Sequence, residues 1–295
     1  MAGAVLVTGA AGQLGTELAR ADWPAGYEVV ALDRAALDLT NPAAIATIVA
    51  SRDWAAVING AAYTAVDRAE GDQVAAWQVN ALAPAAFAAA CKEAGVPLVQ
   101  VSTDYVFDGS KDAAWTVDDP VAPLGVYGAS KLGGELAVRT SGARHAIVRT
   151  AWVVSAHGSN FVKTMLRVGA ERDVLRVVDD QRGSPTGAAD LAAALRTIAV
   201  RLAENPDAPT GTFHFANAGA TSWAGFASEI FRQSGLRGGP TARIEPIATA
   251  DYPTPARRPA NSLLATDGLA AFGITPRPWS QALGDILDEL IGAAT

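Results

Sequence analysis

The sequence contains almost no cysteine or histidine. Cys91 is the single cysteine among 295 residues, and the histidines are His145, His157 and His214. One thiol cannot form a disulfide framework, which fits a reducing compartment. The histidines have neither metal-ligand spacing nor cysteine partners, so the sequence disfavours a zinc site. We predict that Cys91 is a buried packing residue and that the histidines lie on the surface or pack in the core.

The sequence also lacks an excess of positive charge and a membrane-length hydrophobic segment near its start. Its formal net charge is −7, whereas a protein that binds a phosphate backbone needs clustered Lys and Arg. The first residues carry no basic region, and their apolar run ends early at a glycine turn. We therefore expect a soluble cytoplasmic protein with neither nucleic acid nor a membrane among its partners.

Strand-length apolar runs alternate with helical patterns through the first half of the chain, which is typical of βαβ units. The predicted fold class is α/β: a Rossmann-type doubly wound parallel sheet with a smaller C-terminal substrate-binding α/β lobe. We expect the dinucleotide-binding domain at 1–150 and mainly the substrate-binding lobe at 151–295, with some segments of the second part returning to the first domain. The predicted strands are 4–7, 28–32, 55–59, 96–101 and 146–149, and the predicted helices include 13–20, 72–94 and one reached through a loop within 123–140.

After Arg149 the elements become shorter and are separated by Gly, Pro and Asn, as in 183–186, 204–209 and 252–259. Such residues mark loops, and loops carry specificity more often than scaffolding. We therefore assign most substrate contacts to this second part of the chain.

A glycine-rich turn follows the first predicted strand, in the run Thr8-Gly-Ala-Ala-Gly-Gln-Leu-Gly15. Gly9, Gly12 and Gly15 would permit a tight turn, close approach of the backbone to a pyrophosphate, and packing of the next helix on the strand. The spacing is one residue longer at the front than the usual dehydrogenase fingerprint, and an ordinary loop is the alternative. Its place between a strand and a helix favours a dinucleotide site.

Two features after the second predicted strand bear on the cofactor. Asp33 stands where an acid accepts the adenosine ribose hydroxyls, which favours NADH, whereas Arg34 would pair with a ribose phosphate and admit NADPH. The sequence leaves this choice open. Asp38 would either flank the adenine with Leu39 or cap the helix that begins near Pro42, and these roles also stay open.

Tyr127 and Lys131 stand four residues apart, so on a helix they share a face and can point into one pocket. The lysine charge favours the phenolate, and we expect it to lower the Tyr127 pKa from about 10, which makes the phenol a proton donor near neutral pH. Together with the glycine turn earlier in the chain, this pair predicts a nicotinamide-dependent carbonyl reductase.

Two hydroxyl residues leave the fourth predicted strand at the sheet edge where active sites of this architecture lie. Thr103 is our candidate for holding a substrate carbonyl oxygen beside the Tyr127 phenol, and Ser102 is its rival. The alternative is that both hydroxyls only cap a turn, as Ser and Thr often do.

Taken together, these segments resemble the extended short-chain dehydrogenase/reductase (SDR) family, and within it the dTDP-4-dehydrorhamnose reductases. The resemblance covers nearly the whole chain, in the family's order. The glycine turn and the Tyr/Lys pair mark only the superfamily, whereas the blocks at 103–109 and 179–186 are more specific. The matching blocks are 8–15, 59–67 with 69–70, 102–109, 127–131, 149–153 and 178–186.

The resemblance implies reduction of dTDP-4-dehydro-6-deoxy-L-mannose to dTDP-L-rhamnose with NADPH or NADH, in nucleotide-sugar synthesis for cell-surface polysaccharide. It implies that Tyr127 protonates the sugar oxygen, that Lys131 holds the nicotinamide ribose, and that Thr103 positions the carbonyl. Asp104 and Trp152 would contact the sugar. The residues that the resemblance places around the cofactor are Gly9, Gly12, Gln13, Leu14, Asp33, Asp38, Leu39, Ala62, Tyr63, Thr64, Val101, Tyr127 and Lys131.

Some features depart from the family. Ser155 replaces a usual tyrosine, which weakens the predicted wall beside Trp152. Some relatives dimerise through Mg²⁺ held by acidic residues, and Glu17 and Glu289 would supply part of such a site. Ala189 stands where another acid is expected, so we predict no metal ligands. A homodimer is a separate expectation.

Two other functions are compatible with the same fold. A regulatory subunit resembling that of methionine adenosyltransferase would keep the dinucleotide fold as a binding module, but it would not need the intact Thr103, Tyr127 and Lys131. An epimerase or dehydratase for another nucleotide sugar is the second alternative. A dehydratase typically has an acid pair after the Thr103 position, and here Asp104 is followed by Tyr105, which disfavours dehydration.

Overall fold

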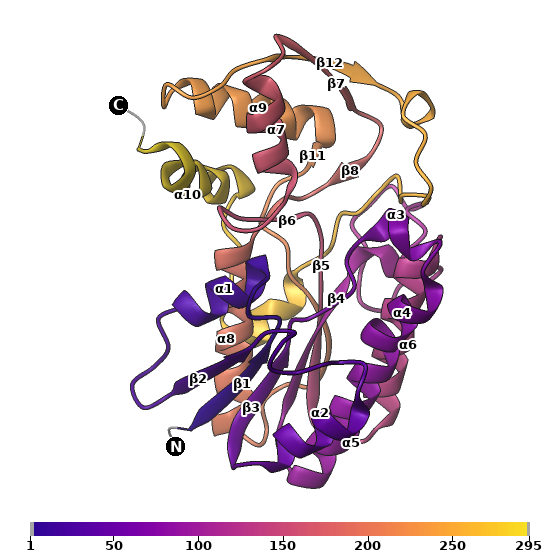
Figure 1. Cartoon of the computed structure of the whole chain (residues 1–295), viewed down its shortest axis with the longest axis vertical. Helices are drawn as coiled ribbons and strands as arrows, with labels where there is room; N and C mark the ends of the chain where they lie inside the picture. The colour runs from indigo at the N-terminus through magenta and orange to yellow at the C-terminus, as the bar shows by residue number, and fades with distance from the viewer. Residues whose placement is uncertain (1–2, 294–295) are drawn as a thin grey trace.

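A computed structural model describes residues 3–293 of the chain. A sheet with helices on both faces forms the larger part of the molecule, and a smaller lobe of shorter elements stands over one end of the sheet (Figure 1). The first half of the chain, indigo to magenta, builds most of the sheet layer. The predicted α/β class, a Rossmann-type parallel sheet with a smaller α/β lobe, is confirmed.

All six strands of the main sheet run parallel, in the order β10-β5-β4-β3-β1-β2. Strand β1 is a buried run of mainly Val, Leu and Ala, as expected where helices cover both faces of a parallel sheet. Five of the six strands are those predicted, with ends that differ by a few residues. The strands are β1 (Ala4–Thr8), β2 (Glu28–Leu32), β3 (Trp54–Asn59), β4 (Leu98–Thr103), β5 (His145–Thr150) and β10 (Gly211–His214).

Helices cover both faces of this sheet (Figure 1). Side chains alternate along a strand, so Val5 and Val7 pack with α1 and α8, whereas Leu6 packs with α2, α5 and α6 on the other face. Cys91 of α5 is fully buried in the second layer, which confirms its predicted packing role. These helices are α1 (Gln13–Arg20), α2 (Pro42–Ala50), α5 (Ala83–Ala94), α6 (Val126–Thr140) and α8 (Ala188–Glu204).

The helix predicted over 72–94 is present but not uniform. It consists of α4 (Gln73–Trp77), a π-helical turn η1 (Gln78–Leu82) and then α5. Asn80 in this turn accepts a hydrogen bond from the Tyr63 backbone at 2.8 Å. The segment Gln73–Ala94 is long and apolar enough to cross a membrane, yet 50% of its most apolar stretch is buried inside the protein. In this structure the segment packs against one face of the main sheet.

The smaller lobe has its own apolar core, formed by α7, α9 and α10 against the pair β7 and β12. Two short strand pairs, β6 with β9 and β8 with β11, connect it to the sheet layer. The bounds of these elements are β6 (Val153–Val154), α7 (Phe161–Gly169), β7 (Val174–Val178), β8 (Arg182–Gly183), β9 (Thr186–Gly187), β11 (Thr221–Ser222), α9 (Trp223–Gly235), β12 (Arg243–Ile247), the short helix η3 (Thr249–Asp251) and α10 (Trp279–Ile291). Three further short helices lie elsewhere: α3 (Val66–Ala69), η2 (Asp104–Val106) and η4 (Asp267–Phe272).

The strand order reverses between β1 and β3, because β2 lies beyond β1 on one side and β4 beyond β3 on the other. Ligands of open α/β sheets bind at the carboxyl ends of the strands beside such a reversal. The glycine turn follows β1 and Gly60 follows β3, so both lie at this point, facing the smaller lobe.

Candidate active site

A cleft of about 660 Å³ lies at the carboxyl ends of the strands, between the sheet and the smaller lobe. Every residue that the sequence predicted for the cofactor, the substrate or the chemistry lines this one cleft, although they come from many separate segments. These residues are Gly9, Gly12, Gln13, Leu14, Asp33, Asp38, Leu39, Ala62, Tyr63, Thr64, Val101, Thr103, Asp104, Tyr127, Lys131 and Trp152, the last from the loop between β5 and β6.

The glycine turn has the close packing that its sequence predicts. Gly9 adopts φ +82°, which side chains rarely tolerate, and a Cβ atom on Gly15 would lie 2.1 Å from the Gly9 carbonyl oxygen. The first turn of α1 therefore rests directly on the loop after β1. Its N-terminus carries Gly12 and Gln13 at the cleft, where backbone N–H groups are suited to a phosphate.

The structure excludes one of the two roles considered for Asp38. Asn41 caps α2, because its Oδ1 accepts from the backbone N–H groups of Ala43 and Ala44, so the capping role for Asp38 is wrong. Asp38 instead accepts from the Thr40 backbone and lines the cleft. Asp33, just beyond β2, also lines the cleft, and its Oδ1 accepts from the backbone N–H groups of Ala35 and Ala36.

Tyr127 and Lys131 lie on α6, in its first and second turns, and both reach the cleft. The Lys131 ammonium donates to the Val101 carbonyl oxygen at 2.7 Å. Burial lowers the Lys131 pKa to about 8, against the Glu135 charge, which raises it. Burial raises the Tyr127 pKa to about 12, only partly offset by the Thr103 hydroxyl. The expected lowering of the Tyr127 pKa is therefore wrong for this structure, because desolvation is the largest effect on the phenol.

The two rival hydroxyls differ in what they contact. Ser102 donates to the Glu135 carboxylate at 2.6 Å, away from Tyr127. Thr103 donates to Asp104 Oδ1 at 3.1 Å and lies within reach of the Tyr127 phenol. The geometry therefore favours Thr103 over Ser102 as the hydroxyl beside the phenol. Burial raises the pKa of Asp104 to about 6, and nearby hydroxyls offset only part of that rise.

Trp152 forms the wall of the cleft next to the smaller lobe. It has φ 51°, the one non-glycine residue with a positive φ among those described. Its indole stacks on Trp223 with ring centroids 3.6 Å apart, and a Cβ atom on Gly183 would lie 2.5 Å from it. Ser155, at the position of a usual tyrosine, bonds Gln13 at 3.1 Å, so it supports the glycine turn and does not extend the wall.

Some cleft residues were not predicted from the sequence. Arg68 and Asp72 come from the region of α3 and α4, and Leu191 comes from α8 in the second half of the chain. Arg68 and Asp72 follow the recognised block 59–67 directly, so extending that block would have found them. Nothing in the local sequence of Leu191 distinguishes it from the other apolar residues of α8.

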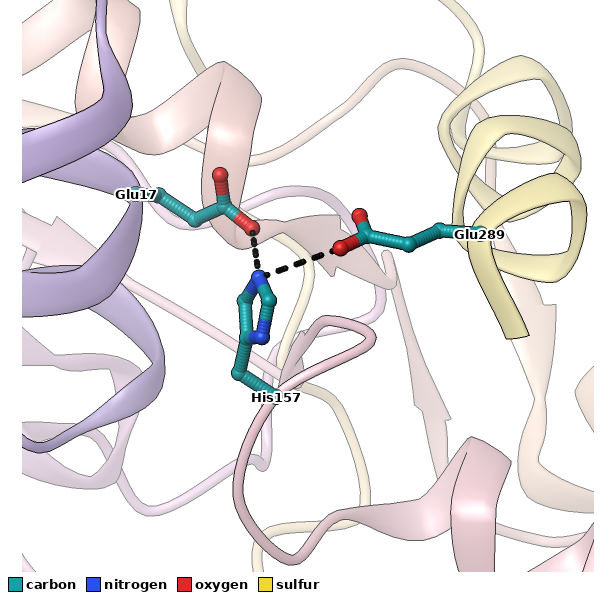
Figure 2. Close-up of side chains that lie close together, drawn as sticks. All are labelled: Glu17, His157 and Glu289. Atoms are coloured by element: carbon teal, nitrogen blue, oxygen red, sulfur yellow. Dashed lines mark ion pairs between the residues drawn. The ribbon is translucent and has the colours of Figure 1, made fainter.

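The acidic residues considered for Mg²⁺ do come together, but with unexpected neighbours. Figure 2 shows Glu17 of α1 and Glu289 of α10 pointing at His157, whose Nε2 lies 3.3 Å and 3.5 Å from their carboxylates. Arg20 also enters this Glu17–His157–Glu289 cluster and donates to Glu289 at 2.8 Å. Mg²⁺ requires oxygen ligands in octahedral geometry, whereas this set includes an imidazole and a guanidinium, and Ala189 offers no ligand. The donor set does not fit Mg²⁺.

Known proteins with similar sequences identify the family of this chain. Residues 3–291 match the family described as RmlD substrate binding domain. The chain belongs to this family. It is 44% identical over 295 residues to the dTDP-4-dehydrorhamnose reductase of Burkholderia thailandensis, covering 97% of this chain and 99% of that protein. The enzyme of the same name from Escherichia coli is 40% identical over 293 residues, with 97% of each chain covered.

Solved structures of this family have the same architecture. The crystal structure of dTDP-4-dehydrorhamnose reductase from Bacillus anthracis in complex with NADP superposes with a TM-score of 0.90 at 36% identity, covering 98% of this chain and 100% of that one. The UDP-glucose 4-epimerase of Thermus thermophilus, in complex with NAD, has a TM-score of 0.76 at 21% identity, covering 99% and 100%. The epimerase shows only that the fold is shared.

Proposed function

We propose that this protein is an NADPH-dependent dTDP-4-dehydrorhamnose reductase, which reduces dTDP-4-dehydro-6-deoxy-L-mannose to dTDP-L-rhamnose. The observation that carries this proposal is the meeting of the glycine turn with Thr103, Tyr127 and Lys131 in one cleft. The family, whose members include enzymes of this name, supports the choice of substrate. The reaction is a step of dTDP-rhamnose synthesis.

The cofactor half of the cleft would hold NADPH or NADH. Gly9, Gly12, Gln13 and Leu14 would hold the pyrophosphate at the start of α1. Asp33, Asp38 and Leu39 would surround the adenosine, while Ala62, Tyr63, Thr64 and Val101 would line the path to the nicotinamide. Arg34 also lines the cleft and would receive a ribose phosphate, which favours NADPH. When bound, the reduced nicotinamide supplies the hydride for the keto carbon.

The chain's own residues would supply the proton and hold the substrate. Thr103 would orient the ketone oxygen, and Tyr127 would transfer its phenolic proton to that oxygen as the alcohol forms. Lys131 would hold the nicotinamide ribose and stabilise the phenolate that the transfer leaves. Asp104 and Trp152 would contact the sugar and exclude water beside the reacting carbon.

The location of the protein and the division of the chain follow from this function. We propose a soluble cytoplasmic enzyme with a dinucleotide-binding part at 1–150 and a mainly substrate-binding part at 151–295. We also propose a homodimer. Its two subunits would not share a Mg²⁺ ion at the Glu17–His157–Glu289 cluster, because that donor set does not fit Mg²⁺. A binding module without activity is disfavoured, because it would gain nothing from a phenol placed beside a threonine hydroxyl in the cleft.

One assay tests the proposal directly. The purified protein is mixed with NADPH and the 4-keto sugar nucleotide, and loss of absorbance at the reduced-nicotinamide band is followed. We expect oxidation that depends on both compounds, and dTDP-L-rhamnose as the product on chromatography. A matched reaction with NADH measures cofactor preference. Absence of oxidation by a folded, NADPH-binding protein would refute the reductase function and leave the binding module as the better account.

A further inference from the structure

A buried carboxylate lies on the same helix face as the proposed catalytic pair. Glu135 follows Lys131 by four residues and Tyr127 by eight, so the three side chains share one face of α6. Glu135 is 1% exposed and does not line the cleft. A charge buried in this way is costly unless other groups compensate it, and its neighbours show how that is done.

Glu135 is hydrogen-bonded to two strands of the sheet. Arg149 of β5 donates two hydrogen bonds to its carboxylate, Nε to Oε1 at 2.8 Å and Nη2 to Oε2 at 2.7 Å. Ser102 of β4 donates to Oε1 at 2.6 Å. Arg139, one turn later on α6, adds a bond to Oε2 at 2.9 Å. A bidentate contact between an arginine and a carboxylate fixes the orientation of the carboxylate and also balances its charge.

Arg149 is itself held on the side away from Glu135. Its guanidinium lies 5.0 Å from the Phe107 ring centroid, and Nη1 lies 3.3 Å from His214 Nε2. Burial and the Arg149 charge lower the pKa of His214 to about 4, so the ring is neutral at pH 7. A neutral ring that donates from Nδ1 to the Trp115 carbonyl, 3.1 Å away, leaves Nε2 free to accept from Arg149.

The bonds of Glu135 and Lys131 reach successive residues of β4. Lys131 donates to the Val101 carbonyl oxygen, and Ser102, the next residue, donates to Glu135. A roll or slide of α6 would break both contacts. On its other side α6 lies tightly against η1, since a Cβ atom on Gly134 would be 2.2 Å from the Asn80 carbonyl oxygen. The helix therefore has little freedom to shift.

Resting on the proposed reductase function, we propose that Glu135 is a positioning residue. Its carboxylate, held by Arg149 and Ser102, fixes the direction of Lys131 and Tyr127 and places a negative charge one helical turn from the Lys131 side chain. Among the titratable groups that line the cleft together with Lys131 are Tyr127, Asp104 and Tyr105. Glu135 is bonded by Arg139 and Arg149, His214 contacts Arg149, and Glu70 bonds the first residue of α6.

The sign of the expected effect follows from the two influences on Lys131. Burial holds its pKa at about 8, already below that of a free lysine, while the Glu135 charge acts upward. Removing that charge lowers the pKa further, so the ammonium is lost at a lower pH. Because Arg149 and Arg139 also pair with Glu135, we expect the pKa of Lys131 to fall by about one unit, the lower end of the effect of a nearby opposite charge.

The first test is the pH dependence of kcat in Glu135→Gln, which keeps an oxygen for Ser102 but removes the charge. We expect the decline on the basic side to move down by about one pH unit, so that the ratio of kcat at pH 8 to kcat at pH 6.5 falls about fourfold. Glu93→Gln, a charge removal at an exposed position of α5, is the matched control and leaves the ratio unchanged. Glu135→Asp keeps the charge, so it lowers kcat without moving the profile.

The second test needs no substrate. The chain has four lysines, Lys92, Lys111, Lys131 and Lys163, so ¹³Cε-lysine labelling gives a readable NMR spectrum in which Lys131→Met assigns one signal. The Lys131 signal should titrate about one pH unit lower in Glu135→Gln. An unchanged midpoint, or a kcat profile that keeps its shape while falling uniformly, overturns the proposal and leaves Glu135 a purely structural residue.

Two results would call for a further measurement: a variant that does not fold, and a wild-type protein without reductase activity. If Glu135→Gln does not fold, the double variant Glu135→Gln/Arg149→Met also removes the buried arginine that the single variant leaves without its carboxylate. The Lys131 midpoint must still move down in the double variant, by less. If the wild-type protein does not oxidise NADPH with the keto sugar, the reductase function fails. The Lys131 titration then still decides whether Glu135 controls that ammonium.

Discussion

The cleft and the Glu17–His157–Glu289 cluster both gather ionisable side chains from distant segments, but they differ in how these groups are partnered. In the cluster, Arg20 lies within 4.0 Å of both carboxylates and the side chains are partly exposed. In the cleft, Asp104 is 3% exposed and its Oδ2 has no hydrogen-bond partner within residues 3–293. Burial without compensation costs stability. The compensated cluster therefore ties elements together, whereas the cleft keeps polar atoms available for a ligand.

The largest effect should come from the cleft phenol. Tyr127→Phe removes the proposed proton donor without changing the packing against Tyr105, whose ring meets Tyr127 edge-on at 5.4 Å. General acids typically contribute 10²–10⁴-fold, so we expect kcat to fall about 10³-fold in the NADPH oxidation assay. The Kd for NADPH, measured by fluorescence, should change less than about threefold. Turnover close to the wild-type rate would show that the proton comes from elsewhere.

The next effect concerns the buried acid. Because the pKa of Asp104 is raised from 3.8 to about 6 in the folded protein, the folded state resists its ionisation. This penalty is absent below the unfolded pKa, grows as the pH rises from about 4 to 6, and is constant above that range. Asp104→Asn removes it. We expect the variant to gain about 2–3 kcal/mol in free energy of unfolding at pH 8 and almost nothing at pH 4.

Urea unfolding at the two pH values measures this difference. Asp118→Asn, at an exposed position, is the matched control and should change stability little at either pH. Asp104→Asn should also lose activity, because Asp104 is proposed to contact the sugar. Gaining stability while losing activity is common when a residue placed for function is replaced. A variant equally stable or less stable than wild type at both pH values would show that Asp104 is better compensated than its contacts indicate.

The smallest effect should come from the Glu17–His157–Glu289 cluster. Because Arg20 already compensates the carboxylates and the donor set does not suit Mg²⁺, neither Mg²⁺ nor EDTA should move the Tm measured by differential scanning fluorimetry. A metal that binds the folded protein would raise Tm with concentration. A rise in Tm with Mg²⁺ that disappears in Glu17→Gln would contradict this account and remove the contrast with the cleft.

Much of the sheet was predictable because its strands are continuous apolar runs between glycine, proline and polar turns. The first five strands and α1 follow from that pattern. The last strand, β10, was not predicted. Its sequence, Gly-Thr-Phe-His, is short and weakly apolar, and it becomes a strand only through pairing with β5. The π turn η1 likewise depends on a long-range contact, the one between Asn80 and Tyr63.

The site was predictable where spacing or a known block marks it, and not where burial decides the chemistry. The Tyr127 and Lys131 spacing placed both side chains at the cleft. The phenol's pKa was predicted in the wrong direction, because the sequence does not reveal how fully Tyr127 is desolvated. His157 had no visible partner in the sequence, since Glu17 and Glu289 lie more than a hundred residues away on either side.

The late position of β10 has a consequence for synthesis on the ribosome. Until residue 214 has been made and has left the exit tunnel, β5 is an open sheet edge. Until residue 204 has done so, α8 is not complete to cover the apolar face that includes Val5 and Val148. Uncovered edges and faces of this kind invite pairing with other chains. The nascent chain therefore exposes this edge from the time β5 is made until β10 has followed it out of the tunnel.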